Sequence, residues 1–336
     1  MRKLICAEPG RFVYEEADIP KPGTGESLLR IRKIGICGTD IHAFAGRQPF
    51  FTYPRVLGHE VAADYVEGDA AGFTAGDKVT VIPYFTAGKD IASQMGKPNC
   101  TNDMRVLGVH IDGAMAEYVV VPSHALRKAT DLDYDDLVLV EPLSIGAHGI
   151  QRGGIIPGEF VLVMGAGPIG LGIIALANIA GGKVIALDVD DSRLAYAKAL
   201  GASYTVSARD ADVQEQLATI TSGDMPTLLF DATGNTAAIN NAFQYMAHGA
   251  RYVLVGLQKE EIHFSHPEFH KREGTLMSSR NAVARDFEYV MERLQDKSLD
   301  AQQFITRRVK FEDVAELFTD GNKPLLSGIK TVIEFS

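Results

Sequence analysis

Four residues of this chain carry side chains that together could bind a transition metal. Cys37 lies in the polar segment 35–42, the pair His59-Glu60 follows a glycine, and Glu141 precedes a proline. A thiolate, an imidazole and a carboxylate are ligands that Zn²⁺ accepts, and three protein ligands leave a fourth position open for a substrate. Residue type alone gives a weak signal, because a lone cysteine is more often a small buried apolar residue and a lone histidine more often binds no metal.

A glycine-rich turn at residues 165–170 predicts a dinucleotide-binding site. Its sequence, Gly-Ala-Gly-Pro-Ile-Gly, follows the apolar run 160–164 and opens the apolar helical stretch 169–180, which is the context that the G-x-G-x-x-G motif requires. The first glycine permits a tight turn, the second lets the backbone approach a pyrophosphate, and the third allows close packing of the helix. The N-terminus of that helix offers unpaired N–H groups to the phosphates.

Asp188 predicts NAD rather than NADP as the dinucleotide. It lies at the end of the next predicted strand, where a carboxylate accepts hydrogen bonds from the adenosine ribose and repels a 2′-phosphate. The alternative is a glycine-rich turn in another kind of α/β protein, in which Asp188 caps a helix. The residues expected to bind the cofactor are Gly165, Gly167, Pro168, Ile169, Gly170, Asp188, Arg193, Thr233, Val255 and Gly256.

The elements that must position these residues are of two kinds. The first 140 residues or so read as short strands broken by glycine and proline, such as 28–34 and 116–121, which is typical of a mostly β domain. From about residue 145, strands alternate with helices, which predicts a parallel sheet with right-handed crossovers. The last residues, 328–335, return to a β pattern. We therefore predict an α/β chain in which a β domain, 1–144 and 281–336, is interrupted by a doubly wound parallel-sheet domain, 145–280.

The composition fits an ordinary globular protein of two domains. The chain has 336 residues and a net charge of −10, which argues against a general nucleic-acid binder because such proteins need a basic face. No apolar run is long enough to span a membrane, and the N-terminal apolar stretch is too short for a signal peptide. Three cysteines give no disulfide framework. We expect a cytoplasmic protein that binds neither nucleic acid nor membrane.

These motifs, in this order, resemble the zinc-containing medium-chain dehydrogenase/reductase family, and most of all its sorbitol-like and sugar-acid dehydrogenases. The resemblance covers essentially the whole chain. It implies a GroES-like β domain and a Rossmann domain, with catalysis in the cleft between them. It also implies that Cys37, His59 and Glu141 bind the catalytic zinc, with Glu60 as an alternative ligand that exchanges with Glu141 or with water.

The resemblance also assigns roles to three residues that follow Cys37. Asp40 is expected to accept a hydrogen bond from the ring of His59 and so to fix the orientation of that ring. Thr39 is expected to contact the substrate hydroxyl and start a proton relay, and His42 to pass the proton to solvent. The alternative interpretation of Thr39 and His42 is a polar turn after a strand. Zinc as a Lewis acid would make the substrate hydroxyl acidic, and its carbon would give hydride to the nicotinamide.

One departure from the family pattern predicts a missing metal. Most zinc members carry a second, structural zinc on four cysteines in a lobe. The matching positions here are Ala87, Asp90, Ser93 and Thr101, and Cys100 is only the neighbour of such a position. A closed structural zinc site needs four donors. We therefore expect one catalytic zinc per chain and no structural zinc, with packing or hydrogen bonds in place of the metal.

The substrate is less well defined by the sequence. Glu141 in place of a second cysteine points to the polyol-like branch, and segments 48–55 and 266–272 resemble bacterial members that oxidise aldonates such as L-gulonate or L-galactonate at C5. A sugar acid needs a cation for its carboxylate, although most basic residues are simply solvated at the surface. The candidates are Arg47, Arg55, Lys271 and Arg280.

Two other functions stay open at this point. One is an L-threonine or simple alcohol dehydrogenase of the same fold. The other is a redox sensor that binds NAD and performs no chemistry. Because related enzymes pair their Rossmann sheets, we also expect a homodimer or homotetramer.

Overall fold

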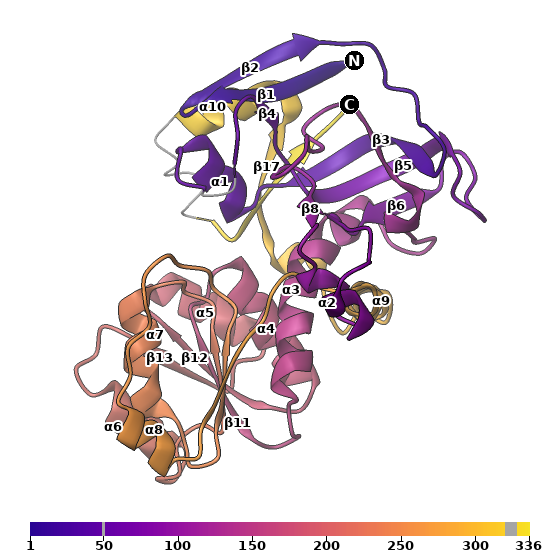
Figure 1. The fold of residues 1–336 in the computed structure, drawn as a ribbon. Helices are drawn as coiled ribbons and strands as arrows, with labels where there is room; N and C mark the ends of the chain where they lie inside the picture. Colours follow the sequence, from indigo (N-terminus) through magenta and orange to yellow (C-terminus); the bar gives the residue numbers. More distant parts are fainter. Residues whose placement is uncertain (49–50, 320–327) are drawn as a thin grey trace. The chain divides into compact units, whose positions relative to one another are not determined.

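The computed structural model describes residues 1–48, 51–319 and 328–336, which form two compact units (Figure 1). The first contains residues 1–141 and 283–336, and the second contains residues 142–282. The predicted boundaries after residues 144 and 280 lie three and two residues from these. Helix α3 (Tyr134–Gly153) begins in the first unit and ends in the second.

The first unit is built mainly from antiparallel strands. Its largest sheet has the order β10-β6-β5-β3-β18-β17, and β9 also pairs with β3. Two smaller sheets have the orders β2-β1-β4 and β7-β8. The strands are β1 (Arg2–Glu8), β2 (Arg11–Glu16), β3 (Glu26–Gly35), β4 (Arg55–Val56), β5 (Glu60–Gly68), β6 (Lys78–Val81), β7 (Tyr84–Phe85), β8 (Arg105–Val106), β9 (Tyr118–Pro122), β10 (Leu126–Lys128), β17 (Ile305–Lys310) and β18 (Lys330–Glu334), and the helices besides α3 are α1 (Gly38–Phe44), α2 (Ile91–Gln94), α9 (Ala284–Gln295) and α10 (Val314–Thr319).

Residues from both ends of the chain share one apolar core in the first unit. Leu4 and Leu29 pack in the same buried cluster as Phe318 and Ile333. The ring of Phe318 lies 5.0 Å from that of Phe12 and 5.2 Å from that of Phe44. The C-terminal return is therefore part of the β domain's core and not an appendage to it.

The second unit is a six-stranded parallel sheet with helices on both sides (Figure 1). Its strand order is β13-β12-β11-β14-β15-β16, so the order reverses beside β11, and ligands of such sheets bind at that reversal. The elements are β11 (Phe160–Met164), α4 (Pro168–Ile179), β12 (Lys183–Asp188), α5 (Asp191–Ala199), β13 (Tyr204–Ser207), α6 (Val213–Ile220), β14 (Leu228–Asp231), α7 (Thr236–Ala242), β15 (Arg251–Leu254), α8 (His266–Lys271) and β16 (Thr275–Ser278).

The strands of this sheet are apolar on both faces. Leu162 and Ile185 pack in a cluster with residues of α6 and α7, and their neighbours Val161 and Val184, on the opposite face because side chains alternate along a strand, are also fully buried. This explains the continuous apolar runs of the sequence. No helix among the described residues is long and apolar enough to cross a membrane.

Candidate metal centre and dinucleotide site

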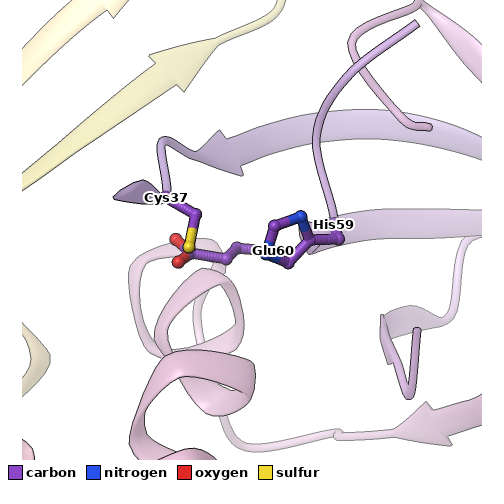
Figure 2. A group of neighbouring side chains, drawn as sticks. All are labelled: Cys37, His59 and Glu60. Atoms are coloured by element: carbon purple, nitrogen blue, oxygen red, sulfur yellow. The ribbon is translucent and has the colours of Figure 1, made fainter. Parts of the chain in front are cut away.

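Three of the four predicted metal ligands converge in the first unit. The candidate ligand atoms of Cys37, His59 and Glu60 all lie within 4.8 Å of one another, and Figure 2 shows the three side chains pointing toward one point. His59 and Glu60 are buried and Cys37 is half-buried. This is the one such group of three or more histidine, cysteine and acidic side chains within residues 1–48, 51–319 and 328–336.

The pairing of two strands brings these residues together. Gly35, the last residue of β3, pairs with Glu60, the first residue of β5, so Cys37 beyond one strand meets His59 before the other. A Cβ atom on Gly35 would lie 1.9 Å from Oε2 of Glu60. Glycine at this position therefore provides the space that the Glu60 carboxylate occupies.

Asp40 fastens the two segments that carry the ligands. Its carboxylate accepts hydrogen bonds from the backbone N–H of Cys37 at 2.9 Å and of Gly58 at 3.1 Å. The prediction that Asp40 accepts a hydrogen bond from the ring of His59 is wrong, because Nδ1 of His59 is buried without a hydrogen-bond partner among the described residues. The two backbone donors take the carboxylate oxygens, so Asp40 orients the ligands through the main chain.

Lys330 pairs with Glu60 in the interior of the first unit. Its Nζ donates to both carboxylate oxygens of Glu60, at 2.6 and 2.8 Å, and to the carbonyl oxygen of Ile36 at 3.2 Å. The exposed fractions of the two side chains are only 3% and 1%. Burial alone would lower the pKa of Lys330, but Glu60, Cys37 and Glu141 raise it, so the lysine stays charged.

Glu141 is buried beside this group but is not one of the three converging residues. Its Oε1 accepts a hydrogen bond from the hydroxyl of Tyr84 in β7. Burial raises the pKa of Glu141 and the charge of Glu60 raises it further, whereas His59, Tyr84 and Lys330 lower it. The predicted role of Glu141 as the third zinc ligand therefore stays a prediction.

The site gathers more groups that can carry negative charge than groups that can carry positive charge. Burial would lower the pKa of His59, but the Cys37 thiolate and the carboxylates of Asp40 and Glu141 raise it well above its ordinary value. Four potential anions, Cys37 with Asp40, Glu60 and Glu141, thus lie near one buried lysine and one imidazole. A bound divalent cation would offset this excess of negative charge.

Thr39 and His42 lie three residues apart on α1, which places them on the same side of the helix. Thr39 is half-buried and His42 is exposed. This gradient from interior to surface agrees with a proton path that begins near Cys37, and the relay itself stays a prediction.

The glycine-rich turn has the backbone geometry of a dinucleotide-binding loop. Gly165 has a φ of +89°, a conformation that favours glycine. A Cβ atom on Gly170 would lie 1.7 Å from the carbonyl oxygen of Gly165, so α4 can pack closely only with glycine there. Gly167 is the N-cap of α4 and Pro168 begins it, followed by Ile169, so the backbone at the N-terminus of the helix is accessible to a phosphate.

Asp188 and Arg193 lie next to this turn. Asp188 ends β12, and its carboxylate accepts hydrogen bonds from the N–H of Ala166 at 2.5 Å and of Asp190 at 2.9 Å. Nη1 of Arg193, in α5, lies 4.0 Å from where a Cβ of Gly167 would be. An acidic and a basic group thus flank the loop, as a ribose and a pyrophosphate require.

The other predicted cofactor residues lie at the carboxyl ends of β14 and β15. Asp231 accepts hydrogen bonds from the N–H and hydroxyl of Thr233 through its side chain, and from the N–H groups of Val255 and Gly256 through its carbonyl oxygen. Burial raises the pKa of Asp231 and these side-chain contacts lower it. A cavity of about 410 Å³ opens beside these turns, lined by Gly234–Ala237 and Gln258–Glu260.

The predicted substrate cations are divided between the two units, with Arg47 and Arg55 in the first and Lys271 and Arg280 in the second. Arg55 donates to Asp112 at 3.3 Å and to Thr52 at 2.9 Å, so its guanidinium is already engaged. Lys271 ends α8 before β16 begins, which places it at the amino edge of the sheet, opposite the edge where ligands bind. This position contradicts the predicted role of Lys271. Arg47 follows α1, and Arg280 follows β16 at its carboxyl end.

Hydrogen bonds cross-link the lobe that was expected to lack a metal. Asp90 accepts from the N–H of Ser93 at 3.0 Å and of Asn102 at 2.8 Å. Asp103 accepts from the N–H of Ala87 at 2.9 Å and from the hydroxyl of Thr86 at 2.7 Å, and the hydroxyl of Thr101 donates to the carbonyl oxygen of Pro98 at 3.4 Å. All four positions expected to correspond to cysteines, Ala87, Asp90, Ser93 and Thr101, therefore take part in this network.

Sequence reasoning missed two residues of the metal centre, Tyr84 and Lys330. Nothing in the pattern around Tyr84 distinguishes it from other strand tyrosines. Lys330 did carry a signal, because it lies in a run of otherwise apolar or β-branched residues, 329–333, where a lysine is buried only when it is paired.

Comparison with known proteins gives matches over both units. Residues 23–131 match the model of the alcohol dehydrogenase GroES-like domain, and residues 168–296 match that of a zinc-binding dehydrogenase. L-galactonate-5-dehydrogenase of Escherichia coli K12 is 40% identical over 98% of this chain and 99% of its own. Sorbitol dehydrogenase of Halalkalibacterium halodurans is 30% identical over 91% of this chain and 92% of its own.

A solved structure shows the same fold over the full length. The alcohol dehydrogenase rspB from E. coli CFT073, complexed with NADH, superposes with a TM-score of 0.92 at 30% identity, covering 100% of this chain and 99% of that one. The predicted combination of a GroES-like β domain and a Rossmann domain is therefore confirmed.

Proposed function

The chain belongs to the zinc-binding dehydrogenases that have an alcohol dehydrogenase GroES-like domain, and from this premise we propose that it oxidises a secondary hydroxyl of a sugar acid. Zinc and NAD are its cofactors, and polyols are the second class of substrate. The observation that carries the proposal is the convergence of Cys37, His59 and Glu60 within 4.8 Å in the first unit.

The donors at this site suit zinc. They offer sulfur, nitrogen and oxygen, and a divalent cation would offset the negative charge that the cysteine and the carboxylates can carry. Cys37, His59 and Glu141 would hold the ion, with Glu60 as the alternative carboxylate. When bound, zinc supplies a Lewis acid that polarises the substrate hydroxyl, and NAD supplies the acceptor for the hydride.

The chain's own residues would orient the substrate and move its proton. Thr39, two residues beyond Cys37, would accept a hydrogen bond from the substrate hydroxyl. His42, which is exposed on the same side of α1, would exchange the proton with solvent. Asp188 would bind the ribose of NAD, with the backbone of residues 165–170 around the pyrophosphate.

The sugar-acid preference draws on the relative that is 40% identical, whose name gives L-galactonate as its substrate. A carboxylate on the substrate needs a cation, and Arg47 and Arg280 are our candidates for it. Arg55 would serve only by exchanging Asp112 for the substrate.

The test is a comparison of turnover by the purified, zinc-loaded protein. We expect NADH to form with L-galactonate or L-gulonate, with kcat/KM about 10- to 100-fold above that for sorbitol, because a charged hydrogen bond contributes about 1.5–3 kcal/mol. Faster oxidation of sorbitol would contradict the sugar-acid preference. If L-threonine or a simple alcohol were the fastest substrate, the chain would be an L-threonine or simple alcohol dehydrogenase. If no substrate led to reduction of NAD, the result would support the redox sensor that binds NAD and performs no chemistry.

We also propose that the protein is a homo-oligomer and lies in the cytoplasm. Strand β16 is an edge of the six-stranded sheet, and edge strands are natural sites for pairing. We expect a homodimer or homotetramer, and a monomer by light scattering would contradict this. The three cysteines are free, which suits the reducing cytoplasm.

A further inference from the structure

The two glutamates at the metal centre, Glu60 and Glu141, accept hydrogen bonds from different side chains. Lys330 donates to both oxygens of Glu60, whereas Tyr84 donates to Oε1 of Glu141. The donors differ in charge: an ammonium group neutralises the carboxylate that it pairs with, and a hydroxyl leaves the charge in place. Of these two carboxylates, Glu141 is therefore the one whose charge is not paired directly with a lysine of the described residues.

Tyr84 is held firmly enough to orient its partner. Its strand β7 pairs with β8, where Tyr84 faces Val106. Its ring makes an edge-to-face contact with Phe287 of α9, with centroids 6.5 Å apart and planes at 76°. The backbone pairing and the ring contact fix the direction of the hydroxyl.

Glu141 needs such a restraint more than the other ligands do. Cys37 and His59 have short side chains on segments that Asp40 ties together. A glutamate has a longer side chain and loses up to about 2 kcal/mol of rotamer freedom when it is fixed. A donor on Oε1 removes part of that freedom before any metal binds, as partners of metal ligands commonly do.

We infer that Tyr84 is a positioning residue whose hydroxyl holds Oε1 of Glu141 so that Oε2 faces the zinc ion. The inference rests on the proposed function, because it requires zinc at this site. It assigns Glu141, rather than the lysine-paired Glu60, as the resting carboxylate ligand.

The test is the variant Tyr84→Phe, which removes the hydroxyl and keeps the ring against Phe287. Zinc affinity is measured by competition with a chelator, and the ligand set is observed through the visible absorption of the cobalt-substituted protein. We expect zinc affinity to fall by roughly 10- to 100-fold and the cobalt spectrum to change. The matched control is Tyr65→Phe, because the Tyr65 hydroxyl donates to the carbonyl oxygen of Gly68 at 2.7 Å in the same unit; it should leave both readouts unchanged.

A second set of variants separates positioning from a general loss of structure. In the Glu141→Gln background, Tyr84→Phe should have almost no further effect on zinc affinity, because the carboxylate that it orients is already gone. An equal loss with and without Glu141 would overturn the inference, as would an unchanged affinity and spectrum in Tyr84→Phe alone. If the unmodified protein bound neither zinc nor cobalt, the proposed function would fail first, and this assignment would fail with it.

Discussion

At the scale of single residues, Gly35 decides where the Glu60 carboxylate can lie. Its backbone conformation is not one that requires glycine, since its φ is not among the positive values. The requirement is steric, because a Cβ atom would lie 1.9 Å from Oε2 of Glu60 and 3.0 Å from its Cβ. Glycine at the end of a strand is here part of the metal centre.

The variant Gly35→Ala should therefore lose metal without unfolding. The added methyl group displaces the Glu60 carboxylate from Lys330, at a cost of about 1–3 kcal/mol in the free energy of unfolding. The candidate ligand atoms of Cys37 and His59 lie within 4.8 Å of that carboxylate, so its displacement disturbs their positions even with Glu141 as the resting carboxylate ligand. We expect a sharp fall in bound zinc, measured by elemental analysis, in a protein that still unfolds cooperatively. Gly38→Ala is the control, because a Cβ atom there meets no atom within 4 Å. Full zinc content in Gly35→Ala would refute this account.

Sequence reasoning succeeded for residues whose chemistry is set by their neighbours in the chain. The turn at 165–170 could be predicted because its glycines, the preceding strand and the following helix are contiguous. Cys37 and His59 could be proposed from residue type and a family resemblance. Tyr84 and Lys330 could not, because their roles come from contacts with Glu141 and Glu60, residues 57 and 270 positions away. Asp40 was assigned the wrong partner because backbone donors are invisible in a sequence.

At the scale of elements, hydrogen bonds cross-link the lobe between β7 and β8, in which we expect no structural zinc. Asp90 caps α2 and reaches Asn102, and Asp103 holds the start of the lobe at Thr86 and Ala87. The absence of the four cysteines was clear from the sequence, but the hydrogen bonds that cross-link the lobe were not. They depend on carboxylates that accept from backbone groups far along the loop.

These carboxylates make the order of the lobe depend on pH. Hydrogen bonds lower the pKa of Asp90 and of Asp103 from the ordinary value of 3.8. Since the folded pKa is the lower one, the stabilisation is complete above pH 3.8 and is lost as the pH falls below it. We expect pepsin to cut the lobe of the unmodified protein faster as the pH falls through this range. In the double variant Asp90→Asn/Asp103→Asn, which lacks both carboxylates, fast cutting should already occur at a higher pH.

The control for the lobe is Asp69→Asn. Asp69 also accepts a backbone N–H from an exposed position, that of Gly25 at 2.7 Å, but lies outside the lobe. It should leave cleavage of residues 86–104 unchanged. Faster cleavage of the unmodified lobe after treatment with a chelator would instead show that a metal holds it.

At the scale of the whole molecule, the first unit is assembled from both ends of the chain. Strand β18 pairs with the second half of β3, beside the ligand-bearing turn, through Ile333 opposite Ile34. It also supplies Lys330. The second unit, in contrast, is one continuous segment, residues 142–282.

Removing residues 328–336 should therefore damage only one of the two sites. The first unit loses β18 and the partner of Glu60, so we expect loss of bound zinc and faster hydrogen exchange in residues 26–35. The second unit keeps all of its strands, and NADH binding, followed by cofactor fluorescence, should persist. Ending the chain after Phe335 is the control. If the truncated protein lost NADH binding and kept its zinc, the prediction would be contradicted.

The pairing of Lys330 with Glu60 also has a consequence for the order in which the protein folds during its synthesis. The two residues are 270 positions apart, and ribosomes add about 5–20 residues per second. Lys330 is therefore synthesised on the order of 10–50 seconds after Glu60. By then the nucleotide-binding segment, residues 142–282, has already been synthesised and can fold. Zinc can thus enter a finished pocket only after β18 has been synthesised and has paired with β3.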